Sequence, residues 1–150
     1  MTEIRPYREA DLDAVIALWQ ACGLLRPWNP PAADIALLRQ SGHGALLVAA
    51  EQTGEPGERP ERLIGTIMVG HDGHRGWVYY VAVDPGRRRQ RLGERLMREA
   101  ETWLRDRGIR KLELMIRDSN ANVAAFYGAL GYEREPVIVM SRWLDGTSRA

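Results

Sequence analysis

The fold is decided by residues 81–93, which read Val81-Ala82-Val83-Asp84-Pro85-Gly86-Arg87-Arg88-Arg89-Gln90-Arg91-Leu92-Gly93. The apolar start has the character of a buried strand, and the strand must end at Pro85, which cannot donate to a ladder. Gly86 then allows the chain to reverse. Beyond the turn, apolar side chains recur at a spacing of four, at Leu92, Leu96, Ala100 and Leu104. This spacing predicts an amphipathic helix that begins at Arg91 or Leu92.

Cations crowd the first turn of this predicted helix, since four of the five residues 87–91 are arginine. The free N–H groups of a first helical turn favour anions, and the macrodipole of the helix adds to that preference. Gly93 has no Cβ and lets the backbone come close to a ligand. The stretch therefore predicts a site for a phosphate-bearing ligand, although an arginine run on its own is more often a solvated face.

Length and composition are those of an ordinary globular protein. The 150 residues are expected to form a single domain, residues 1–150. The net charge of +1 is too small to imply a general affinity for nucleic acid or membranes. Cys22 is the only cysteine, which excludes an intrachain disulfide and a Cys-rich metal site, and no metal is expected. With no signal peptide and no run of ~20 apolar residues, a cytoplasmic protein is the expectation.

The hydrophobic pattern predicts strands and helices along the whole chain. Strands are expected at residues 3–7, 45–50, 63–69, 77–83, 111–116 and 137–140, and further helices at residues 11–22, 32–39 and 120–130. Asp11 is expected to cap the first helix, and Gly23 to end it. This order fits an α/β fold of the α+β kind, with a mixed, mostly antiparallel sheet and helices on both faces.

Two segments carry recognisable motifs. Residues 88–93 read Arg-Arg-Gln-Arg-Leu-Gly, which is similar to the acetyl-CoA pyrophosphate loop Arg/Gln-x-x-Gly-x-Gly/Ala of the GCN5-related N-acetyltransferase (GNAT) superfamily. Residues 120–132 are similar to the block Asn-x-x-Ala-x-x-x-Tyr-x-x-x-Gly-Phe/Tyr of the same family. Residues 25–29 and 72–76 also resemble a small bacterial branch, the YpeA-type acetyltransferases. The resemblance covers nearly the whole chain and implies a central sheet that is splayed at the cofactor site.

Arg91 departs from the family pattern, because it occupies the place of the first glycine of the loop. If the backbone takes a positive φ there, arginine costs roughly 1–2 kcal/mol. If the residue is already helical, arginine is harmless and adds a cation near the pyrophosphate. We expect the helical case.

The resemblance implies that acetyl-CoA is the cosubstrate and that its acetyl group moves to a primary amine by direct attack. Pantetheine is expected along Val81, Ala82 and Val83, with a backbone N–H near Val81 holding the oxyanion. The pyrophosphate is expected on the amides of Arg88, Arg89, Gln90, Arg91, Leu92 and Gly93. Asn120 and Tyr127 are implied to contact CoA, and Tyr127 is implied to be the catalytic acid that protonates the leaving thiolate.

The resemblance also implies an acceptor site, whose predicted walls are Trp28, Asn29, His71, His74 and Tyr79. Family members often carry a carboxylate near the positions of Tyr79 and Tyr80, and both are tyrosine here. The general base is therefore left open between His71, His74, Glu113 and a water relay. The acceptor is equally open: a small-molecule amine, or an amine of a peptide or protein.

Other functions are compatible with the same residues. Without the carboxylate, the protein could be a sensor that binds acyl-CoA and does not catalyse. A nucleic-acid binder that uses the arginines of residues 87–98 is the less favoured alternative, and we expect neither a nucleic-acid nor a membrane partner. Tyr127 could be a core tyrosine, and Asn120 could merely cap its helix. A monomer or a homodimer is expected.

Overall fold

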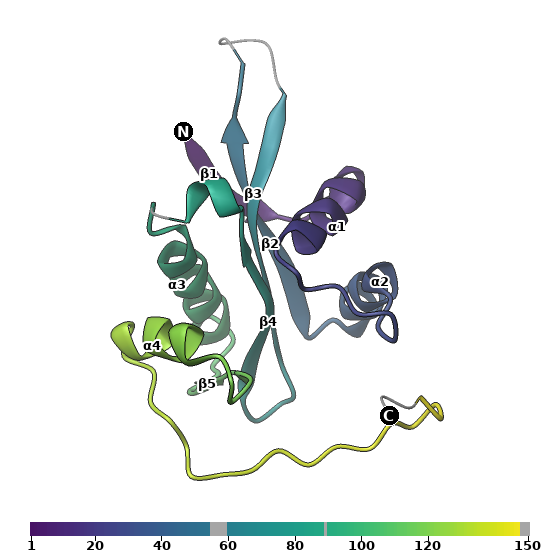
Figure 1. Ribbon diagram of the computed structural model, residues 1–150, viewed down its shortest axis with the longest axis vertical. Coiled ribbons are helices and arrows are strands. Elements are labelled where there is room, and N and C mark those ends of the chain that lie inside the picture. The colour runs from purple at the N-terminus through teal and green to yellow at the C-terminus, as the bar shows by residue number, and fades with distance from the viewer. Residues whose placement is uncertain (55–59, 89, 148–150) are drawn as a thin grey trace. The chain divides into compact units, whose positions relative to one another are not determined.

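The structure is a computed structural model that describes residues 1–54, 60–88 and 90–147. The chain falls into two compact units, Met1–Leu114 and Met115–Ala150. The first unit holds β1 (Thr2–Pro6), α1 (Leu12–Ala21), α2 (Pro31–Ser41), β2 (Gly44–Gln52), β3 (Glu61–His71), β4 (Gly76–Val83), α3 (Leu92–Arg105) and β5 (Leu112–Glu113). The second unit holds α4 (Ala121–Ala129), and Figure 1 labels all of these elements.

The sheet of the first unit runs in the order β1-β2-β3-β4-β5. Neighbours from β1 to β4 pair antiparallel, whereas β5 pairs parallel with β4. This last pairing joins only Gly76 to Leu112 and Trp77 to Glu113. From Val78 onward, no described residue adds a strand to this edge of β4. The expected mixed, mostly antiparallel sheet is confirmed, and it opens where β4 and β5 part.

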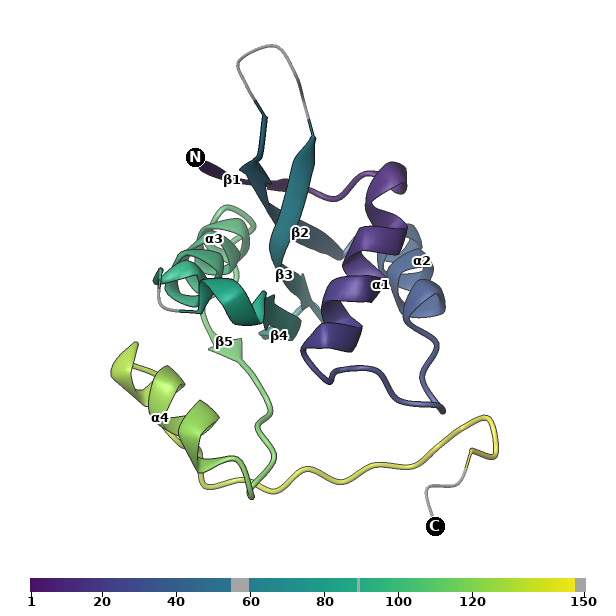
Figure 2. The same ribbon diagram turned by 45° about the horizontal axis from the view of Figure 1, so that its top comes forward.

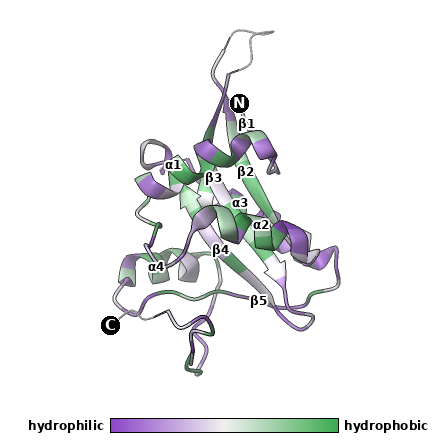
Figure 3. Ribbon diagram, turned by 90° about the vertical axis from the view of Figure 1, so that its right-hand side faces the viewer, coloured by the Kyte–Doolittle hydropathy of each residue, from purple (hydrophilic) through white to green (hydrophobic). Residues whose placement is uncertain are grey.

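Helices cover both faces of this sheet, as predicted. Helices α1 and α2 lie on one side and α3 on the other (Figure 1, Figure 2). The core on the α1 and α2 side is made by Val15, Leu18, Trp19, Ile35, Leu46, Val48, Met68 and Ala82. On the other side, α3 buries Leu92, Leu96, Met97, Ala100 and Leu104, so the predicted spacing of four is its buried stripe. Strand β2, in the middle of these layers, is mainly hydrophobic (Figure 3).

Two glycines let α3 pack directly against the sheet. A Cβ on Gly65 of β3 would lie 3.1 Å from Leu92 Cδ2 and 3.1 Å from Leu96 Cδ1. A Cβ on Gly76 of β4 would overlap Leu104 Cδ1. Helix α3 is therefore seated at its first and its last turn, which fixes its N-terminus beside the end of β4.

Asp11 does not cap α1 through its side chain, contrary to the sequence prediction. Its buried carboxylate accepts hydrogen bonds from the Arg5 guanidinium at 2.9 and 3.1 Å and from the Arg8 N–H at 2.8 Å. A buried charge requires a partner, so pairing with Arg5 takes precedence over capping. Gly23 follows the helix with a φ of 70°, as its predicted role requires.

Two predicted strands differ from the structure. The strand expected at residues 111–116 is reduced to β5, Leu112–Glu113. Residues 137–140 are not a strand. Strand N–H and C=O groups need a neighbouring ladder, and the described part of the second unit offers residues 137–140 no strand to pair with.

The second unit is organised around α4. Asn120 Oδ1 accepts a hydrogen bond from the Val123 N–H at 3.3 Å, which confirms the predicted cap. Gly131 follows the helix with a φ of 95°, where glycine is favoured. Neither α4 nor another helix of the described residues is long and apolar enough to cross a membrane.

Candidate functional site

Strand β4 carries a bulge at the point where its outer edge is free. Tyr79 pairs with Met68 and Ala82 pairs with Thr66, so residues 80 and 81 face the single residue Ile67. Tyr80 has a φ of 50°, a value that is rare for a residue other than glycine. Such a conformation persists only when its surroundings hold it in place.

Three contacts of the bulge supply that support. The Trp19 indole N–H donates to Thr66 Oγ1 at 2.8 Å, and Thr66 Oγ1 donates to the Tyr80 carbonyl oxygen at 2.8 Å. The rings of Trp19 and Tyr80 stack with centroids 3.8 Å apart. Trp19 and Thr66 are both 0% exposed. The bulge is therefore held by a fully buried polar chain together with an aromatic stack.

This chain also sets the direction of the next amide. The peptide between Tyr80 and Val81 is trans, so its C=O and N–H point in opposite directions. Because the carbonyl of Tyr80 points to Thr66 on β3, the N–H of Val81 points away from Thr66. The family resemblance implies Val81 as the oxyanion donor, but no sequence pattern predicts the contacts that orient its N–H.

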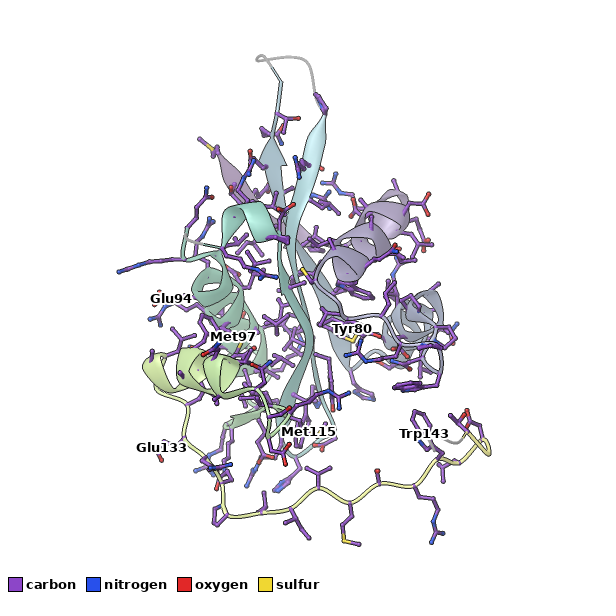
Figure 4. The ribbon with its side chains drawn as sticks, in the orientation of Figure 1. Tyr80, Glu94, Met97, Met115, Glu133 and Trp143 are labelled. Carbon is purple, nitrogen blue, oxygen red and sulfur yellow. The ribbon has the colours of Figure 1, made fainter. Side chains whose placement is uncertain are left out.

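A second network joins the hydroxyl of Tyr80 to α2 and to the loop before it. The hydroxyl donates to Asp34 Oδ2 at 2.6 Å. Asn29 Nδ2 donates to the same carboxylate oxygen at 2.9 Å and to the Tyr80 hydroxyl at 3.2 Å. Burial raises the pKa of Tyr80, and the bond to Asp34 raises it further, so the phenol keeps its proton. Figure 4 labels Tyr80 on the side of the sheet that α2 covers.

In the turn between β4 and α3, the conformation of Arg91 differs from the prediction. Arg91 is not helical, as we expected, but left-handed, with φ 55° and ψ 24°. The left-handed conformation costs an arginine about 1–2 kcal/mol, whereas glycine adopts it freely. The turn therefore requires a backbone conformation that suits glycine better than arginine. The first helical bond runs from the Arg95 N–H to the Arg91 carbonyl at 3.1 Å. The N–H groups of residues 92–94 precede that bond and have no partner inside the helix.

The arginines around this turn are not equivalent. Arg87 pairs with Glu51 through two bonds, at 2.8 and 3.1 Å. Arg98 pairs with Glu94 at 3.0 Å. Among the described residues, the side chains of Arg88 and Arg91 are exposed and enter no ion pair. Arg89 lies outside the described residues. An anion at the start of α3 would therefore meet the cations of Arg88 and Arg91.

The remaining predicted residues of the cofactor loop lie on the same stretch. Gln90 is exposed in the turn, Leu92 begins α3 and is buried, and Gly93 follows it in the first turn. Ala82 is buried in the core, while Val81 and Val83 are half-buried at the end of β4. These residues thus follow one another from the end of β4 to the first turn of α3, and their role in ligand binding stays a prediction.

The predicted walls of the acceptor site fall into separate groups. Tyr79 pairs with Met68, so it lies on the α1 and α2 face, where it is 46% exposed. Asn29 lies on that same face through its bonds to Tyr80 and Asp34, and Trp28 precedes it in the loop. His71 lies instead on the α3 side, with its ring 6.3 Å from Trp103 of that helix. The structure brings Asn29 and Tyr79 to one face and does not bring His71 to them.

His74 belongs to an exposed turn whose shape is set by a carboxylate. Asp72 Oδ1 accepts from the N–H groups of His74 and Arg75 at 2.9 and 2.8 Å. The hydrogen bond from the Arg75 N–H has the larger effect and that from the His74 N–H the next; together they lower the pKa of the Asp72 carboxyl to about 2. Nothing in this turn holds the His74 ring against the bulge, and its substrate-binding role stays a prediction.

Tyr127 packs against other aromatic rings of its own unit. Its ring lies edge-on to Phe126, with centroids 5.0 Å apart, and to Tyr132, at 5.9 Å. Burial raises the pKa of the Tyr127 phenol, so it carries a proton at neutral pH. That state is compatible with a proton donor and with a core tyrosine alike.

Sequence comparison identifies the class of protein. The acetyltransferase (GNAT) family matches residues 12–132, a range that includes both motifs. An acetyltransferase of Pectobacterium atrosepticum is 40% identical over 143 residues, which cover 95% of this chain and 95% of that protein. The protein is therefore an acetyltransferase. The chain belongs to the GNAT family, as its two motifs predicted.

Solved structures of this family share the fold. An aminoglycoside N-acetyltransferase, AAC(6')-Iy in complex with CoA, has a TM-score of 0.75 at 18% identity, covering 96% of this chain and 95% of its own. AAC(6')-Ih of Acinetobacter baumannii, an aminoglycoside 6'-N-acetyltransferase, has a TM-score of 0.73 at 20% identity, covering 96% and 99%. A Trypanosoma brucei acetyltransferase has a TM-score of 0.69 at 22% identity, covering 95% and 100%. At these identities the likeness establishes the fold.

Proposed function

We propose that the protein moves the acetyl group of acetyl-CoA to a primary amine by direct attack of the amine. One observation carries the proposal: the free edge of β4, the bulge at Tyr80 and the N-terminus of α3 follow one another on a single stretch. A strand edge supplies N–H and C=O groups for an extended amide-bearing chain, and a helix N-terminus suits a pyrophosphate. Pantetheine and pyrophosphate are joined in this order in CoA.

The residues present fit such a ligand. Under this proposal pantetheine lies along Val81 to Val83, and the pyrophosphate binds the amides at the start of α3 with the cations of Arg88 and Arg91. The left-handed Arg91 supports this assignment, because the family places glycine there. The proposal also gives CoA contacts to Arg89, Gln90, Leu92, Gly93, Asn120 and Tyr127, as the resemblance implies.

Each chemical step is assigned to one group of the chain. Acetyl-CoA supplies an activated thioester. The N–H of Val81 stabilises the oxygen that becomes negative during attack, which is worth about 10²–10³ in rate for one such donor. Tyr127 donates its proton to the departing thiolate. The family match over residues 12–132 includes both Val81 and Tyr127, which supports giving each of them a role.

The acceptor is assigned only by class, a primary amine. Aminoglycosides belong in the test set because two of the compared structures are aminoglycoside N-acetyltransferases. Small amines, amino acids, peptide N-termini and lysine peptides belong there as well. On this chain, Trp28, Asn29 and Tyr79 are the proposed acceptor wall.

A coupled thiol assay tests the proposal. Purified protein is incubated with acetyl-CoA and each amine, free CoA is detected through its thiol, and mass spectrometry identifies the acetylated product. The proposal predicts CoA release that depends on the amine and matches the product in amount. Binding of acetyl-CoA without release in any reaction would instead support the non-catalytic sensor.

A further inference from the structure

We propose that Asp34 binds the ammonium group of the acceptor and accepts its proton; this inference rests on the proposed acetyl transfer. Both hydrogen bonds of the carboxylate fall on the same oxygen, Oδ2, from Tyr80 at 2.6 Å and from Asn29 at 2.9 Å. Within residues 1–54, 60–88 and 90–147, Oδ1 accepts no hydrogen bond and Asp34 has no ion-pair partner. The negative charge of Asp34 is thus bonded only by neutral donors, the Tyr80 hydroxyl and the Asn29 amide.

A half-buried carboxylate in this state suits a cationic ligand. Burial of a charge is unfavourable unless an opposite charge compensates it, and Asp34 is half-buried. A primary ammonium supplies one positive charge and three N–H donors. It can bond to Oδ1 while Oδ2 keeps its bonds to Tyr80 and Asn29.

The position of Asp34 connects it to the proposed reaction site. Tyr80 is the bulged residue, and the amide after it is the N–H of Val81. The stack of Trp19 on Tyr80 holds the ring, so the hydroxyl that bonds Asp34 has a fixed place. The exposed Tyr79 lies on the same face. An amine bound at Asp34 would therefore lie next to the residues that shape the bulge.

The other candidate bases are less suited. Glu113 is within 3.6 Å of the Arg75 guanidinium and 3.9 Å of Lys111 Nζ. His71 lies on the α3 side, against Trp103. The carboxylate that the family often carries on β4 is thus replaced here by one on α2, which reaches the strand through the Tyr80 hydroxyl.

The proton and the bonds balance without a further reagent. The ammonium gives one proton to the Asp34 carboxylate, which leaves a neutral amine with a free electron pair. The amine attacks the thioester carbon; a carbon–nitrogen bond forms and the carbon–sulfur bond breaks. The nitrogen then loses a second proton, which balances the proton that the departing thiolate takes up, so CoA leaves as the thiol. Asp34 then releases its proton to water, so acetyl-CoA and an ammonium become an amide, CoA and one proton.

Two variants of Asp34 separate its charge from its shape. Asp34→Asn keeps the size of the side chain and an oxygen for Tyr80, but it removes the charge. Asp34→Glu keeps the charge and displaces it by one methylene. If Asp34 acts through its charge, Asp34→Asn should lose more activity than Asp34→Glu. If Asp34 only holds the loop in place, Asp34→Glu should lose more. Asp13→Asn, which removes an exposed carboxylate from the first turn of α1, is the matched control.

The test compares acceptors that arrive charged with acceptors that arrive neutral. Alkylamines, with benzylamine among them, are ammonium ions at pH 7, whereas aniline and related arylamines are neutral. Asp34→Asn should lower kcat/KM for alkylamines by about 100-fold or more and for arylamines by less than about fivefold. Asp34→Glu should retain more alkylamine activity than Asp34→Asn, and Asp13→Asn should match the wild type.

A binding measurement gives a second readout. Titration of ¹⁵N-labelled protein with n-propylammonium chloride should shift the amide signals of Tyr80 and Val81, and Asp34→Asn should abolish the shift. Unchanged alkylamine activity in Asp34→Asn, or equal losses for both amine classes, would overturn the inference while leaving acetyl transfer intact. A wild type that acetylates no amine would remove the proposed function itself.

Discussion

Thr66 Oγ1 on β3 donates a hydrogen bond of 2.8 Å to the main-chain carbonyl of Tyr80 on β4. This bond fixes a carbonyl inside a bulge, where the regular ladder cannot. The same hydroxyl accepts from the Trp19 indole at 2.8 Å, so both its donor and its acceptor capacity are in use. The orientation of the Val81 N–H thus depends on one buried hydroxyl.

Thr66→Val should reduce turnover while Thr66→Ser preserves it. Valine has the shape of threonine but leaves the Trp19 N–H and the Tyr80 carbonyl unpaired, which destabilises the fold by about 1–3 kcal/mol. Turnover should fall by about 10–100-fold as the Val81 N–H loses its fixed direction. Serine loses only a methyl group, about 1 kcal/mol. Stopped assays and thermal melts on both variants check this, and equal turnover in the two would show that the hydroxyl has no role in catalysis.

Arg91→Gly should raise stability and weaken cofactor binding. Glycine removes the left-handed strain of about 1–2 kcal/mol but adds backbone freedom to the unfolded chain, so the net gain is about 0.5–1 kcal/mol. Arg88 has φ −66° and ψ −17°, so Arg88→Gly removes a cation without relieving strain. Urea unfolding should separate the two variants. If Arg91→Gly loses as much stability as Arg88→Gly, the left-handed backbone of Arg91 is not strained.

Trp28→Ala should raise the Michaelis constant of the amine and leave that of acetyl-CoA nearly unchanged. The reason is its place in the loop next to Asn29, which bonds Asp34 and Tyr80. Steady-state kinetics with each substrate varied in turn measure both constants. Equal increases in the two constants would assign Trp28 a purely structural role.

Tyr127→Phe should lower turnover by about 10²–10⁴-fold if the phenol protonates the departing thiolate. Phenylalanine keeps the ring and its contacts with Phe126 and Tyr132. Acetyl-CoA affinity should change by no more than about 1 kcal/mol, and the melting temperature should hold. Phe126→Leu serves as a control for loss of aromatic packing. Full activity in Tyr127→Phe would move the proton to water or another group, and a collapse in stability would mark Tyr127 as a core residue.

The parts of the fold that could be predicted depend on patterns among residues that are close together in the sequence. The buried stripe of α3 follows from the spacing of Leu92, Leu96 and Leu104, and Asn120 caps its helix as its residue type suggests. The family itself was readable because residues 88–93 and 120–132 each carry a motif. These features depend on residues a few positions apart.

The contacts of the site could not be predicted, because they join distant parts of the chain. Asp34 meets a tyrosine 46 positions away, and Trp19 meets a threonine 47 positions away. Asp34 lies within the predicted helix of residues 32–39, and no sequence motif marks it as functional. Arg91 was assigned to a helix because a positive φ is uncommon for arginine. His71 was grouped with Asn29 by resemblance, and only the sheet register places it on the opposite face.

The central claim is that this chain binds acetyl-CoA at the turn between β4 and α3. Isothermal titration of the folded wild type with acetyl-CoA tests it most directly, with Arg88→Glu as the variant and exposed Arg105→Glu, in the last turn of α3, as the control. The account predicts one site of micromolar affinity, about −8 kcal/mol, strongly weakened by Arg88→Glu and nearly unchanged by Arg105→Glu. No binding of acetyl-CoA to the folded wild type would contradict it.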